Sequence, residues 1–147
     1  MSKTSDTNGY SHPFADKIGI VTVGHGSRVP ETKGIYEDIA RKATKKTGLC
    51  VRPAYMKFGK PTIADSVKKF IDEGFKKVIV VPLFILPGMH VSEDIPIVLG
   101  LKKGETPDFG YDPIEVPDDV ELIYSTHIGS DDGLASVILE RVKEALL

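Results

Sequence analysis

Short apolar runs alternate along this chain with stretches in which apolar residues recur every three or four positions. The continuous runs predict β-strands at 18–23, 49–58, 78–86 and 120–124. The helical spacing predicts helices at 31–46, 63–73, about 93–101 and 134–145. Strands that alternate with helices in this way favour a parallel α/β sheet with right-handed crossover connections.

The composition of two strands predicts their places in the sheet. The run 78–86 shows no polar alternation, which is typical of a central parallel strand covered on both faces. Pro53 has no N–H for the hydrogen-bond ladder, so we expect the strand 49–58 at an edge. If the first and third strands are neighbours, the chain reverses direction between them and their carboxyl ends flank a ligand crevice.

Residues at the predicted helix ends fit this arrangement. Gly48 is a natural stop for the first helix, and Pro61 stands near the first position of the second. Ser92 can cap the helix after the third strand, and the negative charge of Asp94 is expected to support its start. The segment 102–119 is rich in glycine, proline and aspartate and is expected to be a long irregular loop.

The length of 147 residues allows one domain, which we place at 17–147, after a flexible polar tail at 1–16. The net charge of −2 gives no broad basic face, so no nucleic-acid or membrane partner is expected. No apolar stretch reaches the ~18 residues of a membrane span, and no signal-peptide layout opens the chain. We therefore expect a cytoplasmic protein. Cys50 is the only cysteine, which excludes an internal disulfide, and we expect it to be a small, at least half-buried hydrophobe.

Two histidines follow the first and third strands, the two whose carboxyl ends flank the crevice if they are neighbours. His25 lies between Gly24 and Gly26 after the first strand, and His90 follows the apolar run of the third. We therefore expect the two imidazoles to face each other across the crevice. Imidazole suits cobalt, nickel, zinc and iron, whereas calcium and magnesium prefer oxygen ligands. Two protein ligands leave most coordination positions open, which suits a metal that passes to another ligand rather than a structural ion.

Several residues beside the histidines have two interpretations. Arg28, Lys57 and Lys60 either contact an anionic ligand or are solvated charges. Ser27 is expected to cap the first helix more readily than to bind a carboxylate. His127 follows the fourth strand and can share the same rim of the sheet.

The chain resembles the small class II chelatases, the short archaeal sirohydrochlorin cobaltochelatases and nickelochelatases. The resemblance runs from about Ile18 to the C-terminus and rests on the order and spacing of six segments taken together. These segments are Val23–Arg28, Lys60–Ile63, Val80–Phe84, Gly88–His90, Asp94–Pro96 and Ile128–Asp132.

This resemblance implies a single-domain chelatase-like α/β fold, a parallel four-stranded sheet flanked by helices. It also implies insertion of Ni²⁺ or Co²⁺, bound as the substrate metal with no permanent cofactor, into sirohydrochlorin. His25 and His90 match the metal ligands, and His25 also matches the catalytic proton acceptor. The substrate contacts match Lys60, Ile85, Leu86, Pro87, Gly88, Met89 and His90. Backbone N–H groups at Gly26, Ser27, Gly88 and Met89, with the charge of Arg28, can add contacts to the anionic macrocycle.

The resemblance bears further on assembly and on the choice of metal. Larger relatives look like two fused copies of this unit, so we expect a homodimer. Nickel insertion would serve the coenzyme of methanogenesis and cobalt insertion would serve cobalamin, and we favour nickel with cobalt as an alternative.

The chain departs from its relatives at three points. Lys60 stands where relatives can carry an acidic residue, and Pro87 stiffens the loop before His90. The segment 102–117 holds no histidine, so no metal store is expected there.

Two other functions stay open. A carrier that binds metal or tetrapyrrole without turnover would use the same residues. Histidine phosphatases also place a histidine after their first strand, but in an Arg-His-Gly setting, whereas Gly24 precedes His25 here.

Overall fold

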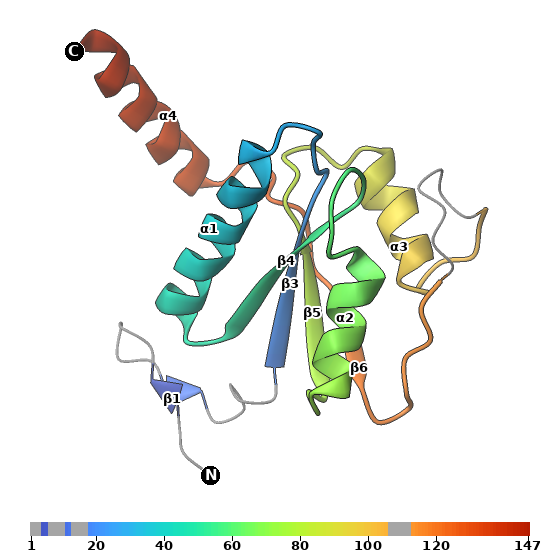
Figure 1. Ribbon diagram of the computed structural model, residues 1–147. Coiled ribbons are helices and arrows are strands. Elements are labelled where there is room, and N and C mark those ends of the chain that lie inside the picture. The colour runs from blue at the N-terminus through green and yellow to red at the C-terminus, as the bar shows by residue number, and fades with distance from the viewer. Residues whose placement is uncertain (1–3, 6–10, 13–17, 106–112) are drawn as a thin grey trace.

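A four-stranded parallel sheet with strand order β4-β3-β5-β6 forms the centre of the protein (Figure 1). The computed structural model describes residues 4–5, 11–12, 18–105 and 113–147. Its strands are β3 (Ile18–Gly24), β4 (Cys50–Tyr55), β5 (Lys77–Pro82) and β6 (Glu121–Tyr124). Its helices are α1 (Glu31–Thr47), α2 (Ile63–Asp72), α3 (Ile95–Val98) and α4 (Asp132–Leu146), with a π-helical turn η2 (His90–Asp94) before α3. The predicted parallel α/β sheet flanked by helices is confirmed.

The strand order confirms the positions predicted for the first three strands. β3 pairs with β5 in parallel from Ile18 opposite Lys77 to Val23 opposite Pro82. β4 lies at the edge of the sheet, and its Pro53 stands opposite Thr22 of β3. The edge position accommodates the missing N–H of Pro53, because an edge strand pairs on one side alone. The carboxyl ends of β3 and β5 therefore lie side by side.

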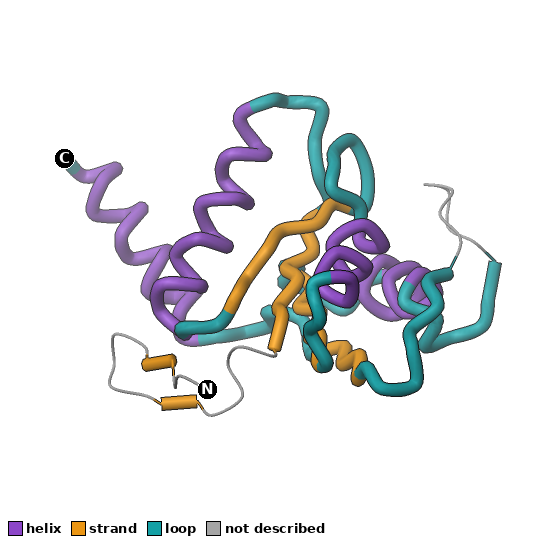
Figure 2. Tube along the Cα trace, turned by 60° about the horizontal axis from the view of Figure 1, so that its bottom comes forward, coloured by secondary structure: helices purple, strands orange, loops and turns teal. Residues whose placement is uncertain are grey.

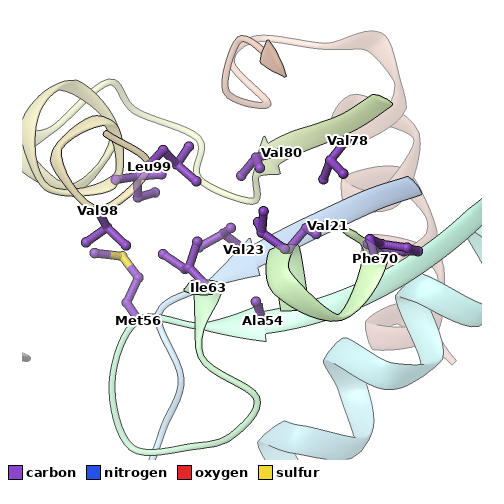
Figure 3. Close-up of a cluster of buried hydrophobic side chains, with 12 residues drawn as sticks. Val21, Val23, Ala54, Met56, Ile63, Phe70, Val78, Val80, Val98 and Leu99 are labelled. Carbon is purple, nitrogen blue, oxygen red and sulfur yellow. The ribbon is translucent and has the colours of Figure 1, made fainter. Parts of the chain in front are cut away.

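One face of the sheet packs against α2 and α3 and forms the hydrophobic core (Figure 3). Alternate strand residues point to this face, because successive side chains of a strand point to opposite sides. Gly19 of β3 leaves room there for Phe70 of α2, whose ring would lie 2.6 Å from a Cβ atom at that position. The fully buried side chains of the cluster include Val21, Val23, Val78, Val80, Val67, Phe70, Ile95 and Val98. Cys50 is half-buried against this cluster, as predicted.

The other face of the sheet is covered less completely. α1 packs there, and the ring of its Tyr36 occupies the space that a side chain at Gly24 would fill. Ile79, Val81 and Ile123 alternate with core residues and are half-buried. α4 projects away from the sheet, and none of its residues is buried (Figures 1 and 2). Part of this sheet face and α4 therefore lack partners within the described part of the chain.

The end of α1 and the start of α2 are both capped by residues of the chain itself. Gly48 ends α1 in the left-handed conformation with φ of 74°, and its N–H donates to the Thr44 carbonyl, as predicted. α2 begins with a capping box, in which Thr62 and Asp65 each accept a backbone N–H of the other. Pro61 directly precedes the cap, so it lies near the first helical position, as predicted.

The third strand is shorter than predicted, and the helix after it begins earlier. β5 ends at Pro82, one residue before the position that would pair with Gly24, the last residue of β3. The following helical segment begins at His90 and not at residue 93, so Ser92 does not cap it. The Ser92 hydroxyl instead donates to the Pro87 carbonyl, at 3.1 Å. The second strand is likewise shorter than the predicted 49–58.

The N-terminal segment and the loop predicted at 102–119 are described only in part. Two short strands ahead of the sheet, β1 (Thr4–Ser5) and β2 (Ser11–His12), pair antiparallel and were not predicted. The rest of the predicted tail at 1–16 lies outside the described residues, as do residues 106–112 of the predicted loop. No helix among the described residues has the length and apolar character needed to cross a bilayer.

Candidate metal-binding site

His25 and His90 lie opposite each other at the carboxyl end of the sheet. His25 directly follows β3, and His90 opens the π-helical turn that comes after β5. Their ring centroids are 5.3 Å apart, and the ring planes are inclined by 50°. The structure thus brings together the two imidazoles that the strand order predicts to be neighbours. π-Helical turns are rare and are frequently found at functional sites.

Hydrogen bonds occupy the same ring nitrogen in both histidines. The Nδ1 atom of His90 lies 2.8 Å from the Oδ2 atom of Asp94, one turn further along the helical segment. The Nδ1 atom of His25 lies 3.2 Å from the Gly26 carbonyl oxygen. An oxygen acceptor at Nδ1 places the proton there, so Nε2 of each neutral ring keeps its lone pair. Both rings are therefore prepared to bind a metal ion through Nε2.

Asp94 has a role beyond the one predicted for it. It lies at the start of α3, where a negative charge was expected, but its side chain makes no capping hydrogen bond there. Its carboxylate is only partly exposed and bonds to His90, the arrangement by which carboxylates orient metal-binding histidines and raise their basicity. The signal that could have found this role is the four-residue spacing between His90 and Asp94, which puts both on one helical face.

Tyr124 anchors the π-helical turn to the sheet. Its hydroxyl, at the end of β6, donates to the Val91 carbonyl at 2.8 Å. Burial raises the pKa of Tyr124 to about 12, so the hydroxyl keeps its proton at neutral pH and continues to donate. The backbone next to His90 is thereby held by a neighbouring strand.

The backbone around His25 is held by the loop after β4. The N–H of Met56 donates to the Gly24 carbonyl at 3.0 Å, and the N–H of Lys57 donates to the His25 carbonyl at 2.9 Å. Gly26 has φ of 86°, and a Cβ atom there would overlap the Lys57 carbonyl. This close approach requires glycine and brings Phe58 next to His25, with ring centroids 6.3 Å apart.

A cleft of about 510 Å³ lies beside His90 and is lined by the loop after β5. The beginning of this loop is fixed by backbone hydrogen bonds. The N–H of Leu83 donates to the Val23 carbonyl, and the N–H of Ile128 donates to the Phe84 carbonyl. The tip is exposed. The residues of the tip include the apolar side chains Ile85, Leu86 and Met89, together with Pro87 and Gly88. An exposed apolar tip beside a metal-binding pair is suited to a flat apolar ligand.

The other residues predicted for the site include Ser27, Arg28 and Lys60. The Ser27 hydroxyl accepts the Val29 N–H at 3.0 Å and does not cap α1, whose first cap residue is Pro30. Arg28 places its guanidinium carbon 4.6 Å from the centroid of the Phe58 ring. Lys60 is exposed at the tip of the loop after β4.

His127 lines a different hollow from the one beside His90. Its neighbours there include Leu134 and Val137, at the beginning of α4. In the part of the chain that is described, no group of three or more His, Cys, Asp or Glu side chains is placed to hold a metal ion. His25 and His90 are therefore the two candidate metal ligands of this site, and an ion between them would keep its other coordination positions open.

The sequence profile of the CbiX family matches residues 19–145. The chain is 36% identical over 137 residues to a sirohydrochlorin cobaltochelatase of Methanococcus maripaludis, covering 83% of this chain and 95% of that protein. It is 38% identical over 138 residues to a sirohydrochlorin cobaltochelatase of Methanococcus aeolicus, covering 84% and 96% of the two chains.

Solved structures with the same fold include a CbiX protein of cobalamin biosynthesis from Marinobacter aquaeolei VT8. It has a TM-score of 0.66 and 25% identity, and the match covers 88% of this chain and 97% of that one. SirB from Bacillus subtilis with Fe³⁺ has a TM-score of 0.66 and 22% identity, over 89% of this chain and 48% of SirB. This chain thus spans about half the length of SirB, and that likeness shows the shared fold alone.

Proposed function

Since the chain belongs to the CbiX family, we propose that it is a cytoplasmic chelatase that inserts Co²⁺ or Ni²⁺ into sirohydrochlorin. The observation that carries the proposal is the His25–His90 pair, 5.3 Å apart beside an apolar cleft. The names of the methanococcal relatives support sirohydrochlorin as the macrocycle. The ion is the substrate, and the enzyme uses no permanent cofactor.

The histidines hold the ion through Nε2 and release it to the macrocycle. Because two ligands leave most of the coordination sphere open, pyrrole nitrogens replace water and then imidazole in steps. Asp94 keeps the proton of His90 on Nδ1, so the lone pair of Nε2 faces the ion throughout.

His25 also accepts a proton from the macrocycle, and its hydrogen bond limits how. Insertion removes two pyrrole protons, and one nitrogen cannot bind a metal and a proton together. The Nδ1 atom of His25 already carries the proton that it donates to Gly26. His25 therefore accepts one of the two pyrrole protons at Nε2, after the ion has left it, and the second proton passes to a carboxylate of the macrocycle.

The macrocycle lies on the loop after β5, and its carboxylates meet donors at the rim. Ile85, Leu86, Pro87, Gly88 and Met89 give an exposed apolar surface next to His90. Arg28 and Lys60 supply positive charge, and the backbone of Gly26 and Ser27 lies at the same end of the sheet. A charged donor strengthens a hydrogen bond to a carboxylate.

The choice between cobalt and nickel does not follow from the ligands. Imidazole binds both ions, and the usual order of divalent affinities favours nickel only modestly. The relatives are named for cobalt, which supports a role in cobalamin synthesis. We retain nickel, with a role in the coenzyme of methanogenesis, as the second substrate.

Anaerobic incubation of the protein with sirohydrochlorin and Co²⁺, Ni²⁺ or Fe²⁺ tests the function directly. We expect the visible spectrum of the macrocycle to change faster than in protein-free controls with Co²⁺ and Ni²⁺, because the histidine pair presents a partly desolvated ion. The fastest ion identifies the preferred metal. Binding without faster insertion would favour a carrier, and hydrolysis of simple phosphoesters would favour a phosphatase.

The exposed apolar face of α4 supports a homodimer. Ile138 is 64% exposed, and Val142, on the next turn of the same helical face, is 48% exposed. The sheet face on which α1 packs is covered incompletely, and it includes the half-buried side chains of Ile79, Val81 and Ile123. In a symmetric dimer, the α4 helix of each copy would cover the incompletely covered sheet face of the other copy. The same contact would therefore form twice.

An Ile138→Asp variant is expected to be a monomer under conditions in which the wild-type protein is a dimer. A charge in the middle of an apolar interface raises the dissociation constant by about 30-fold or more. Light scattering coupled to size-exclusion chromatography measures the mass at several concentrations. Ser136→Asp adds the same charge to the polar side of α4 and should stay dimeric. A monomeric wild-type protein across the micromolar range contradicts the proposal.

A further inference from the structure

Phe58 is held in a backbone conformation that disfavours an aromatic residue. It lies in the loop between β4 and α2 with φ of 57°, and among the described residues it is the one non-glycine with positive φ. The left-handed region is unfavourable for residues with a Cβ atom, and for bulky residues it is uncommon. Such strain persists where the surroundings impose it, often at ligand sites.

Packing does not explain why this position carries an aromatic ring. Phe58 is 50% exposed, so much of the ring faces solvent. Gly59, the next residue, has no such positive φ, which means that the turn places its unfavourable conformation on the aromatic residue and not on the glycine. The loop therefore holds a half-exposed aromatic side chain in a strained backbone conformation.

The backbone fixes the ring beside the metal-binding pair. Lys57, directly before Phe58, donates its N–H to the His25 carbonyl at 2.9 Å, and beyond the loop the Tyr55 N–H donates to the Pro61 carbonyl at 3.0 Å. The loop is thus closed on itself and tied to the turn that carries His25. The ring centroid of Phe58 lies 6.3 Å from that of His25, which lies 5.3 Å from that of His90.

Arg28 completes this side of the site. Its guanidinium carbon lies 4.6 Å from the Phe58 ring centroid, within the range of a cation–π contact. The side chain is exposed and makes no ion pair with a carboxylate among the residues that the structure describes. Stacking on the ring orients the planar group and leaves its edge N–H donors for a carboxylate.

We propose that Phe58 and Arg28 form a second substrate wall, opposite the loop after β5. The exposed face of Phe58 stacks on the edge of the tetrapyrrole, and Arg28 binds one of its peripheral carboxylates in a bidentate contact. The inference rests on the proposed function, since it concerns the same macrocycle. It assigns a binding role to Phe58, the residue at which the predicted strand 49–58 ends.

Removing the ring and relieving the strain have opposite consequences, so variants at Phe58 separate the two roles. Phe58→Gly and Phe58→Ala are both expected to weaken the binding of metal-free sirohydrochlorin by about tenfold, because each loses the stacking surface. Phe58→Gly should unfold at a higher temperature than Phe58→Ala, because glycine adopts positive φ without a Cβ penalty. Phe58→Tyr keeps the ring and should bind as the wild type does.

Two measurements test these variants. Titration with metal-free sirohydrochlorin, followed by absorbance, gives the binding affinity, and thermal unfolding gives the stability. Arg28→Gln is expected to weaken binding and to reduce its dependence on salt, because one charge-assisted contact is lost. Arg28→Lys keeps the charge but not the planar fork and should fall between the wild type and Arg28→Gln. Binding by Phe58→Gly within twofold of the wild type, while the wild type still inserts metal, overturns this inference alone. A wild-type protein that neither binds nor metallates sirohydrochlorin overturns the proposed function as well.

Discussion

Replacing either His25 or His90 by alanine is expected to abolish metal insertion and to leave the fold intact. Each substitution removes one of the two imidazoles that hold the ion, and His25→Ala also removes the proton acceptor. The loss of a positioned acid–base group alone slows a reaction by roughly 10²–10⁴-fold. Both side chains are partly exposed, so the free energy of unfolding should change by less than about 1 kcal/mol.

The measurement compares initial rates of Co²⁺ and Ni²⁺ insertion after subtraction of the protein-free rate, with circular dichroism to check the fold. His127→Ala is the matched control, because His127 also follows a strand but lies with the start of α4. We expect the control to insert metal at the wild-type rate. Near-normal turnover in His25→Ala or His90→Ala would refute the assignment of the metal-binding pair.

The position of the histidine pair was predictable because it depends on strand order. The unbroken apolar run before His90 predicted a central strand, and Pro53 predicted an edge strand. The prediction also required the first and third strands to be neighbours, and the observed order β4-β3-β5-β6 meets this condition. Since parallel strands end at the same edge of a sheet, the neighbouring positions of His25 and His90 followed without any knowledge of their side chains.

The hydrogen bonds around the pair were less predictable because local signals competed there. Ser92 followed by acidic residues is a common pattern at a helix start. In the structure the helical segment begins at His90, the Asp94 carboxylate bonds to the His90 ring, and the Ser92 hydroxyl donates to the Pro87 carbonyl. Two other contacts within the same segment thus take the place of the expected Ser92 cap.

Phe58 and α4 show two other limits of sequence reasoning. An aromatic residue next to an apolar run is read as part of a strand, and no local pattern indicates a positive φ at Phe58. The apolar spacing in α4 predicted a helix with one apolar face, but periodicity does not say which surface covers that face. Both features depend on surfaces remote in sequence or on another molecule.

Gly26→Ala is expected to damage both stability and metal insertion. The backbone at Gly26 has φ of 86°, and a Cβ atom there would overlap the Lys57 carbonyl. Alanine must therefore adopt an unfavourable conformation and also push the loop after β4 away from the turn that carries His25. Positive φ alone costs about 1–2 kcal/mol, so with the overlap we expect a loss of more than about 2 kcal/mol. This corresponds to a fall of roughly 5 to 10 °C in Tm.

Gly34→Ala, at an exposed position in the first turn of α1, is the control of opposite sign. A Cβ atom at Gly34 meets nothing within 4 Å, and alanine favours a helix over glycine by about 0.5–1 kcal/mol. Thermal unfolding of the two variants should therefore shift Tm in opposite directions. If Gly26→Ala unfolds at the wild-type temperature and keeps full insertion activity, the contact between His25 and Lys57 does not hold the site together. If it loses activity at a temperature where it remains folded, the spacing of the two histidines depends on this one close approach of backbones.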